Sequence, residues 1–171
     1  ANMVEELLDF SKFISGKITL NRDYVDINGT IKYMYKQLSL RAKRQKLHFK
    51  VQVQYSISPI LLDENRIKQV LTNLLDNSFK FTPQDGIVEL SVKTEYNNLI
   101  ITVKDNGIGI PKDELPRVTE KFFKGKTDKS SNGIGLSICR EIVELHNGKL
   151  YINSEYKKGT EVKVFIPIDD D

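Results

Sequence analysis

Three polar side chains share a narrow stripe of a predicted helix that runs from Asp63 to about Phe81. Asn73, Asn77 and Lys80 recur at intervals of four and three residues, so they lie on one side of that helix. Asparagine is a poor helix former, and its amide offers an uncharged oxygen of the kind that Mg²⁺ accepts as a ligand. Lys80, at the end of the stripe, is placed to meet a phosphate. The competing interpretation is the solvated face of an amphipathic helix.

A first glycine-containing segment, Asp105 to Pro111, follows directly on a predicted strand and carries Gly107 and Gly109. These glycines either serve turns that need positive φ or let the backbone approach a flat ligand closely. In the second interpretation Asp105, at the strand end, accepts a hydrogen bond from an exocyclic amine such as that of adenine.

A second segment, Ser131 to Leu136, opens a predicted helix and carries Gly133 and Gly135. Unpaired N–H groups and the positive end of the helix dipole make such a start an anion site, although a plain loop entering a helix explains it too. No Gly-Lys-Ser/Thr follows, which excludes a P-loop, and the context is not the βαβ unit of a dinucleotide fold.

The stretch between these two segments is basic and fits either a mobile lid over a nucleotide or a disordered loop. Its lysines are Lys121, Lys124, Lys126 and Lys129.

The elements that must position these residues follow from hydrophobic periodicity. Helices are predicted over residues 3–13, 26–46, 63–81 and 134–146, and strands over 47–53, 57–61, 87–94, 99–104, 149–154 and 160–166. A short helix is also predicted after Pro111. Turns at 97–98 and 157–159 join the last four strands into two hairpins. Consecutive hairpins predict a mostly antiparallel sheet with its helices on one face, an α+β two-layer sandwich.

Length and composition fit one globular domain. The 171 residues are enough for a single sizeable core. The 26 basic and 23 acidic residues leave a net charge of +3, which is too mild to indicate nucleic acid as a partner. The single cysteine, Cys139, excludes an internal disulfide, and no apolar run reaches the length of a membrane span. The chain opens inside a predicted helix, so we expect a piece of a longer protein.

Taken together and in order, these motifs resemble those of sensor histidine kinases. The matching stretches are 73–83 (N box), 105–110 (first glycine box), 120–124 (F box), 133–138 (second glycine box), 159–167 (final strand) and 7–12 (end of the dimerisation helix). The resemblance implies a Bergerat-type sandwich with a mixed, mostly antiparallel sheet, helices on one face and a mobile ATP lid. It also implies that residues 1–20 end the dimerisation helix and form a linker, and that 21–171 are the catalytic ATP-binding domain.

The resemblance further implies which residues handle Mg²⁺ and phosphate. Asn77 is expected to hold Mg²⁺ with Asn73 nearby, and Lys80 to contact phosphate; these three are the expected catalytic residues. Further contacts to the ATP phosphates are expected from Lys124 of the lid and from Gly133 and Gly135 of the second glycine box. Ile134 and Leu136 of that box are expected to contact ATP as well.

The adenine is expected to lie against the first glycine box. By the same resemblance, Asp105 reads the adenine amine and Phe122 anchors the lid. Around the base, the expected residues are Phe81 (tyrosine in many relatives), Gly107, Gly109, Ile110 and Thr160.

Kinase activity is favoured over hydrolysis by the residue at position 73. In hydrolysing relatives a glutamate one turn before the metal-binding asparagine activates water, and Asn73 cannot act as a general base at neutral pH. Two alternatives stay open: an ATPase of the MutL or gyrase type, and a non-catalytic interaction module. The second is suggested by Ser131 and Thr119, which replace a glycine and a phenylalanine of the family pattern.

The phosphoacceptor is expected outside this chain. His48 lies in a predicted strand and His146 at a helix end, and neither has the acidic helical context of the family's phosphoacceptor box. We therefore expect ATP binding without autophosphorylation. The expected partners are the protein's own dimerisation domain, a response regulator receiver domain and a second copy in a full-length homodimer. The domain is expected to be cytoplasmic, in a parent anchored to the cell membrane.

Overall fold

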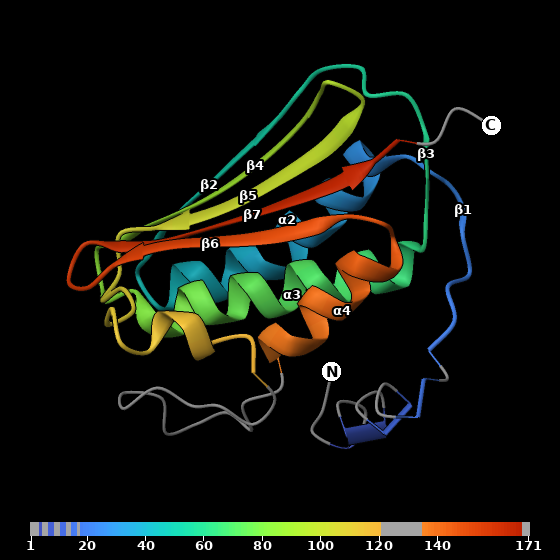
Figure 1. Ribbon diagram of the computed structural model, residues 1–171. Coiled ribbons are helices and arrows are strands. Elements are labelled where there is room, and N and C mark those ends of the chain that lie inside the picture. Colours follow the sequence, from blue (N-terminus) through green and yellow to red (C-terminus); the bar gives the residue numbers. More distant parts are fainter. Residues whose placement is uncertain are drawn as a thin grey trace.

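A five-stranded sheet lies over a layer of three helices (Figure 1). The computed structural model describes residues 18–120 and 135–168, with Val4, Leu7, Leu8, Ser11, Lys12, Ser15 and Gly16. The elements are β1 (Asp23–Val25), α2 (Ile27–Arg44), β2 (His48–Val53), β3 (Ile60–Leu62), α3 (Glu64–Phe81), β4 (Ile87–Glu95), β5 (Asn98–Asp105), η1 (Leu115–Arg117), α4 (Gly135–Leu145), β6 (Lys149–Glu155) and β7 (Gly159–Pro167). The predicted α+β two-layer sandwich is confirmed.

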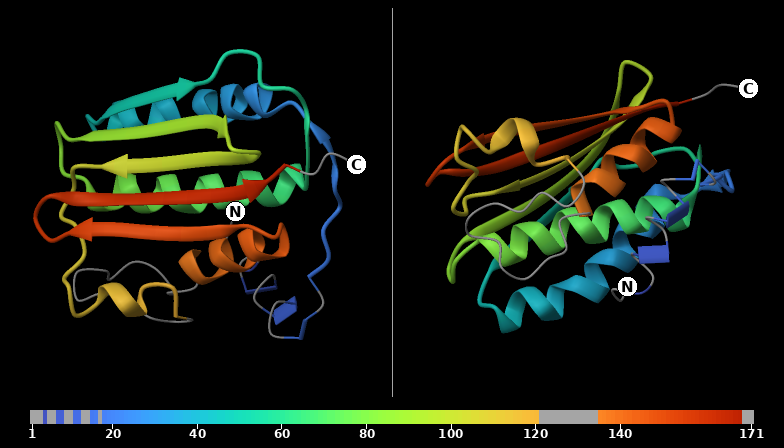
Figure 2. Two further views of the ribbon diagram at one scale, coloured as in Figure 1. Left: turned by 45° about the horizontal axis from the view of Figure 1, so that its top comes forward. Right: turned by 60° about the horizontal axis from the view of Figure 1, so that its bottom comes forward.

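The strand order in the main sheet is β2-β4-β5-β7-β6. The predicted hairpins are present: β4 pairs with β5, and β6 with β7, in antiparallel register. β5 and β7 also run antiparallel, whereas β2 lies parallel to β4 because the chain passes through α3 between them. Figure 2 shows that α2 and β2 form one edge of the sandwich and that α4 and β6 form the other.

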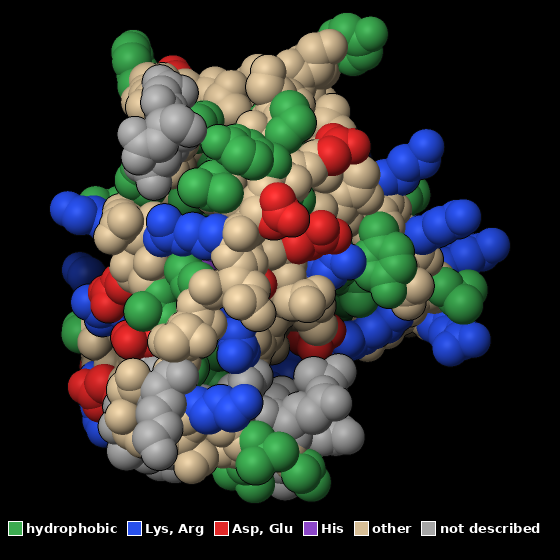
Figure 3. All heavy atoms as spheres, turned by 90° about the vertical axis from the view of Figure 1, so that its right-hand side faces the viewer, with side chains coloured by type: hydrophobic (Ala, Val, Ile, Leu, Met, Phe, Trp, Pro, Cys, Tyr) green, Lys and Arg blue, Asp and Glu red, His purple; other side chains and the backbone are tan. Residues whose placement is uncertain are grey.

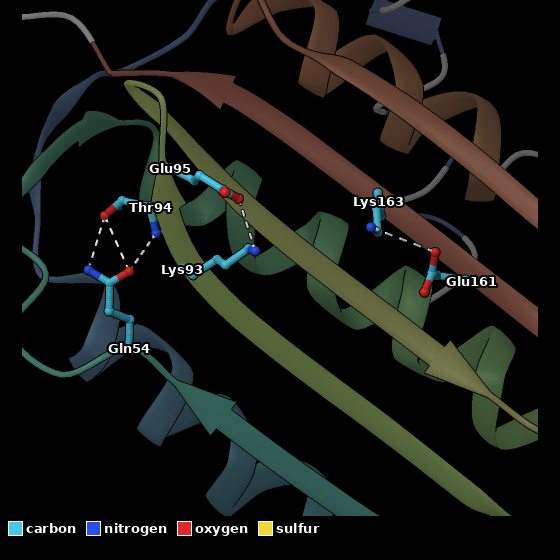
Figure 4. Close-up of polar contacts among 6 residues, drawn as sticks. All are labelled: Gln54, Lys93, Thr94, Glu95, Glu161 and Lys163. Atoms are coloured by element: carbon cyan, nitrogen blue, oxygen red, sulfur yellow. Dashed lines mark hydrogen bonds and ion pairs between the residues drawn. The ribbon is translucent and has the colours of Figure 1, made fainter.

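Alternation along the strands separates a dry face from a wet one. The inward residues of the central strands are buried against the helices: Val88, Leu90, Val92, Leu99, Ile101, Val103, Val162, Val164 and Ile166. Ion pairs lie on the outer face (Figure 4), where Lys93 pairs with Glu95 at 3.0 Å and Lys163 with Glu161 at 4.0 Å. All three helices therefore lie on one side of the sheet.

The central helix, α3, begins where the sequence predicts. The Asp63 side chain caps it by accepting the Arg66 N–H at 3.1 Å. Its apolar face packs under the sheet, leaving the polar stripe on its flank. None of the helices in the described part of the chain is long and apolar enough to cross a membrane.

Two local features differ from the sequence prediction. The second strand after α2 occupies Ile60–Leu62 and pairs with β1, a three-residue strand that the sequence did not predict. The short helix predicted after Pro111 is present but is of 3₁₀ type, η1, with Pro116 in its first turn, where a missing N–H is tolerated.

Candidate functional site

The polar stripe of α3 reaches the start of α4. Asn73, Asn77 and Lys80 are all half-buried. The Asn73 amide donates to the carbonyl of Gly135, the first residue of α4, at 3.5 Å. The Lys80 ammonium lies 4.8 Å from the centre of the Phe81 ring, within the range of a cation–π contact. The stripe thus joins the N box to the second glycine box.

Asn77 is the residue of the stripe best suited to a cation. Its amide makes no hydrogen bond to any residue that the structure describes. The described residues also contain no cluster of three or more His, Cys, Asp or Glu side chains. A divalent ion here would therefore take one amide oxygen from the chain and complete its shell with phosphate oxygens and water, which is the mode that Mg²⁺ favours.

Asp105 ends β5 as a buried carboxylate held by backbone groups. Its Oδ1 accepts the Gly107 N–H at 2.9 Å and the Thr160 N–H at 3.3 Å. Burial raises the pKa of the Asp105 carboxyl above its usual 3.8, while hydrogen bonds from Gly107, Ser78 and Thr160 oppose that rise. A carboxylate fixed in this way can orient a ligand that offers an N–H donor.

The loop after Asp105 passes between the end of α3 and the β6–β7 turn. A Cβ on Gly107 would lie 2.4 Å from the Phe81 carbonyl oxygen, and one on Gly109 would lie 2.1 Å from the Glu155 carbonyl oxygen. Gly109 also has φ of +69°, a conformation that favours glycine. The Ile108 N–H donates to the Phe81 carbonyl at 3.1 Å. These glycines therefore serve close backbone approach as well as a turn.

A serine–threonine pair fixes the far side of this loop. The Ser154 hydroxyl accepts the Ile110 N–H at 2.8 Å and lies 2.8 Å from the Thr160 hydroxyl. Thr160 thus contacts Ser154 through its hydroxyl and donates its backbone N–H to Asp105. The contact brings a residue of β7 to a loop that lies about fifty positions earlier in the chain.

The structure gathers most of the predicted site residues around the end of α3 and the loop that follows β5. Asp105, Gly107, Gly109, Ile110 and Thr160 are linked by the contacts above, and Gly135 and Leu136 open α4 beside Asn73. Four predicted residues lie outside the described part of the chain: Phe122, Lys124, Gly133 and Ile134.

Sequence reasoning missed two serines. Ser78 is buried on α3 and hydrogen-bonds Asp105, and Ser154 holds the loop. Ser78 could have been found, since it is a small polar residue on the apolar side of a helix, next to Asn77. Ser154 gave no comparable signal, because serine is ordinary near a strand end.

Comparison with known proteins gives a consistent picture. Residues 62–170 match the family model described as histidine kinase-, DNA gyrase B-, and HSP90-like ATPase. Sensor histidine kinase YclK of Bacillus subtilis (strain 168) is 33% identical over 171 residues, covering 97% of this chain and 36% of YclK. The chain thus spans about a third of the length of that relative.

Solved structures agree with the sequence matches. Full-length ShkA, in complex with AMPPNP, superposes with a TM-score of 0.85 at 27% identity, covering 96% of this chain and 35% of ShkA. The catalytic domain of histidine kinase ThkA gives a TM-score of 0.78 at 26% identity, covering 87% of this chain and 97% of that domain. A ThkA chain in complex with the response regulator TrrA has a TM-score of 0.78 at 22% identity over 98% of this chain and 48% of its own length, which shows the fold alone.

The family match covers well over half of the chain, and the ThkA domain is matched over almost its whole length. The chain therefore belongs to the histidine kinase-, DNA gyrase B-, and HSP90-like ATPase family and is an ATP-binding catalytic domain of the histidine kinase type.

Proposed function

We propose that this domain binds ATP with Mg²⁺ and presents the γ-phosphate to a histidine on a dimerisation domain of its parent protein, a two-component sensor kinase. The observation that carries the proposal is the placement of Asp105. A buried carboxylate at the end of β5 is held by the first glycine box, at the end of the helix that carries Asn77 and Lys80.

Different residues would bind the adenine base and the phosphates of ATP. The Asp105 carboxylate would accept a hydrogen bond from the adenine amine, beside Gly107, Gly109, Ile110, Thr160 and Phe81. Asn77 would give one ligand to Mg²⁺, which supplies charge neutralisation between the phosphates. Lys80 and the amides at the start of α4 would bind phosphate oxygens, together with Lys124, Gly133, Ile134 and Leu136, and Phe122 would anchor the lid.

Transfer to a histidine fits position 73 better than hydrolysis does. The Asn73 amide is bonded to Gly135 and cannot take a proton from water at neutral pH. In the proposed step the bond from the γ-phosphorus to the ADP oxygen breaks while a phosphorus–nitrogen bond forms at the acceptor imidazole, which loses its proton. The domain's task is positioning and charge neutralisation.

We also propose the place of the domain in a longer protein. Residues 1–20 would end the dimerisation helix and form the linker, and 21–171 would be the catalytic domain. The parent would be a homodimer anchored in the membrane with this domain in the cytoplasm, and would pass its phosphate to a response regulator receiver domain. The support is the relatives' description as sensor kinases and the ThkA–TrrA complex.

A reconstitution separates this proposal from its alternatives. The chain is mixed with the separately produced dimerisation domain of the same parent and γ-labelled ATP, and acid-labile phosphohistidine is measured on each polypeptide. We expect label on the dimerisation domain only, and none when Asn77→Ala replaces the wild-type chain. Steady phosphate release without an acceptor would instead identify an ATPase, and absence of ATP binding would identify an interaction module.

A further inference from the structure

The stretch from α2 into β2 carries positive charge only. Residues 27–50 contain no Asp or Glu and seven basic residues: Lys32, Lys36, Arg41, Lys43, Arg44, Lys46 and Lys50. Setting these seven aside from the 26 basic residues leaves 19 against 23 acidic ones, so the rest of the chain is net negative. The positive charge of the whole chain is thus a local property of this one edge.

Three lysines of this stretch have no ion-pair partner in the described part of the chain. Arg41 pairs with Asp76 of α3. The exposed Lys32, Lys36 and Lys43 have no carboxylate within ion-pair distance among the residues that the structure describes. Figure 3 shows Lys and Arg side chains projecting along its right-hand side, the side on which α2 lies. An anionic partner of these three lysines would therefore displace no ion pair among the described residues.

A hollow with a mixed polar and apolar lining lies among these charges, between α2 and the edge strand β2. It has a volume of about 370 Å³ and is lined by Tyr35, Ser39, Leu40, Ala42, Lys43, Leu47 and Phe49. The side chain of Leu40 is 55% exposed, so it is accessible to a partner. Lys43 belongs to this lining, and Lys36 lies one helical turn before Leu40 on the same face of α2. We call the hollow together with these two lysines the α2–β2 groove.

The floor of the groove is tied to the core and does not depend on an occupant. The Phe49 ring lies 5.7 Å from the Tyr35 ring and 5.2 Å from the Phe79 ring, the latter edge to face. Phe79 is itself buried. A preformed hollow with an aromatic floor and lysines beside it suits a protruding side chain of a protein better than the flat surface of a bilayer.

We propose that the α2–β2 groove docks an acidic segment of a partner protein, with an apolar side chain seated against Leu40 and Tyr35 and carboxylates paired with Lys36 and Lys43. The groove lies on the edge of the sandwich opposite α4 and β6 (Figure 2). The start of α4, at which we propose phosphate binding, thus lies at the other edge. The docking site does not depend on the proposed kinase function.

A peptide titration tests the proposal on the 171-residue chain. The probe is a short fluorescein-labelled peptide rich in glutamate with two leucines one helical turn apart, and binding is followed by anisotropy. We expect saturable binding that weakens as salt is added, because surface charges are screened. A twin peptide with serine in place of leucine should bind more weakly, and a twin with lysine in place of glutamate should not bind.

Variants of the groove supply the decisive comparison. Lys36→Glu with Lys43→Glu, and separately Leu40→Asp, should weaken binding roughly tenfold or more, since each places a like charge against the acidic segment. Lys149→Glu, an exposed charge reversal on the opposite edge strand β6, should leave binding unchanged. Circular dichroism and binding of a fluorescent ATP analogue verify that each variant is folded, and Lys36→Gln with Lys43→Gln replaces the double reversal if that variant unfolds.

Three outcomes would overturn the proposal. The first is equal affinity of the peptide for the wild-type chain and the groove variants. The second is that the chain binds phosphatidylserine vesicles but not the peptide, and that vesicle binding requires Lys36 and Lys43. That result would identify this edge as a membrane-binding surface. The third is binding of a single-stranded oligonucleotide in place of the peptide.

Discussion

At the scale of single residues, Asp105 meets two opposing demands. Its carboxylate is buried at the end of β5, which raises its pKa, and it is held by the N–H groups of Gly107 and Thr160. Burying a charge reduces stability, yet only a charged acceptor binds an exocyclic amine strongly. The buried charge of Asp105 therefore lowers the stability of the domain, while it supports the proposed recognition of adenine.

Replacing Asp105 by asparagine should separate these two effects. The asparagine amide keeps an oxygen that can accept the Gly107 N–H, but it places an N–H₂ group opposite the adenine amine. ATP affinity should therefore fall by roughly tenfold or more, which corresponds to the loss of one hydrogen bond to a charged group. Because the folded-state pKa of Asp105 is raised, its contribution to the free energy of unfolding is full below pH 3.8 and is lost as pH rises through the folded-state pKa. Asp105→Asn should remove this contribution to the pH dependence. ATP-analogue titration and thermal melts across pH measure both. An Asp105→Asn protein that binds ATP as the wild type does would remove Asp105 from the site.

His146 is a second buried ionisable group, and its pKa moves in the other direction. Its Nε2 accepts the Asp63 N–H at 3.1 Å, so Nδ1 carries the proton and donates to the Ile142 carbonyl at 2.8 Å. Burial lowers the pKa of His146 below its usual 6.5; the bond to Ile142 and the charge of Asp63 oppose this, and the charge of Arg22 adds to it. The neutral ring thus connects the end of α4 to the start of α3.

Acid should therefore destabilise the domain through His146. A histidine with a lowered folded-state pKa contributes stability that is present above 6.5 and is lost as pH falls from 6.5 toward the folded value. His146→Gln keeps a hydrogen-bond acceptor and a donor but does not titrate. Between about pH 7.5 and about pH 5.5, which bracket the usual titration range of histidine, its melting temperature should change less than that of the wild type. A parallel decline in both proteins would show that His146 does not cause the acid sensitivity.

At the scale of elements, the loop after β5 must fit between α3 and the β6–β7 turn. Gly109→Ala would combine a positive φ with a Cβ only 2.1 Å from the Glu155 carbonyl oxygen. We expect a loss of about 1–3 kcal/mol of stability and a displaced loop with weaker ATP binding. Chemical denaturation and ATP-analogue titration measure the two effects.

Gly135→Ala is the matched control, because an added Cβ there meets nothing within 4 Å among residues 18–120 and 135–168. Its stability should stay within about 0.5 kcal/mol of the wild type, as for a surface substitution. A drop in ATP affinity for Gly135→Ala at unchanged stability would support the proposed phosphate contact at the start of α4. A stable Gly109→Ala with normal ATP affinity would contradict the close approach of the loop to β6.

The same elements show what sequence could predict and what it could not. Local signals are strong in α3, where a cap and an apolar stripe fix the helix, and in the two hairpins. They are absent in β1, whose three residues are too few to show alternation. The parallel pairing of β2 with β4 and the Asp105–Thr160 bond depend on packing between distant segments, which spacing along the chain does not encode. The glycine boxes marked the loop, but only the structure shows Ser154 holding it.

At the scale of the whole molecule, one apolar core joins both edges of the sandwich. Buried side chains run without a break from α2 through α3 and the sheet to α4, with α3 in the middle. Leu71→Ala, in the fully buried centre of α3, should therefore cost about 2–5 kcal/mol, while exposed Leu40→Ala should cost little. Denaturation should remain a single transition, and separate transitions for the two edges would contradict a shared core.

ATP should stabilise even the edge that it does not touch. If the domain unfolds as one unit, ligand binding to the native state raises the free energy of global unfolding by about 2.7 kcal/mol at a hundredfold excess over Kd. Amides of β2 that exchange only by global unfolding should then gain as much protection from ATP as amides of β6, although β2 lies at the opposite edge of the sheet. Hydrogen exchange with and without ATP measures this, with Asp105→Asn as the control that should gain at most about half as much, because a tenfold weaker Kd leaves only a tenfold excess of ATP. Protection confined to the strands and loop around Asp105 would mean that the α2–β2 edge opens independently of the nucleotide site.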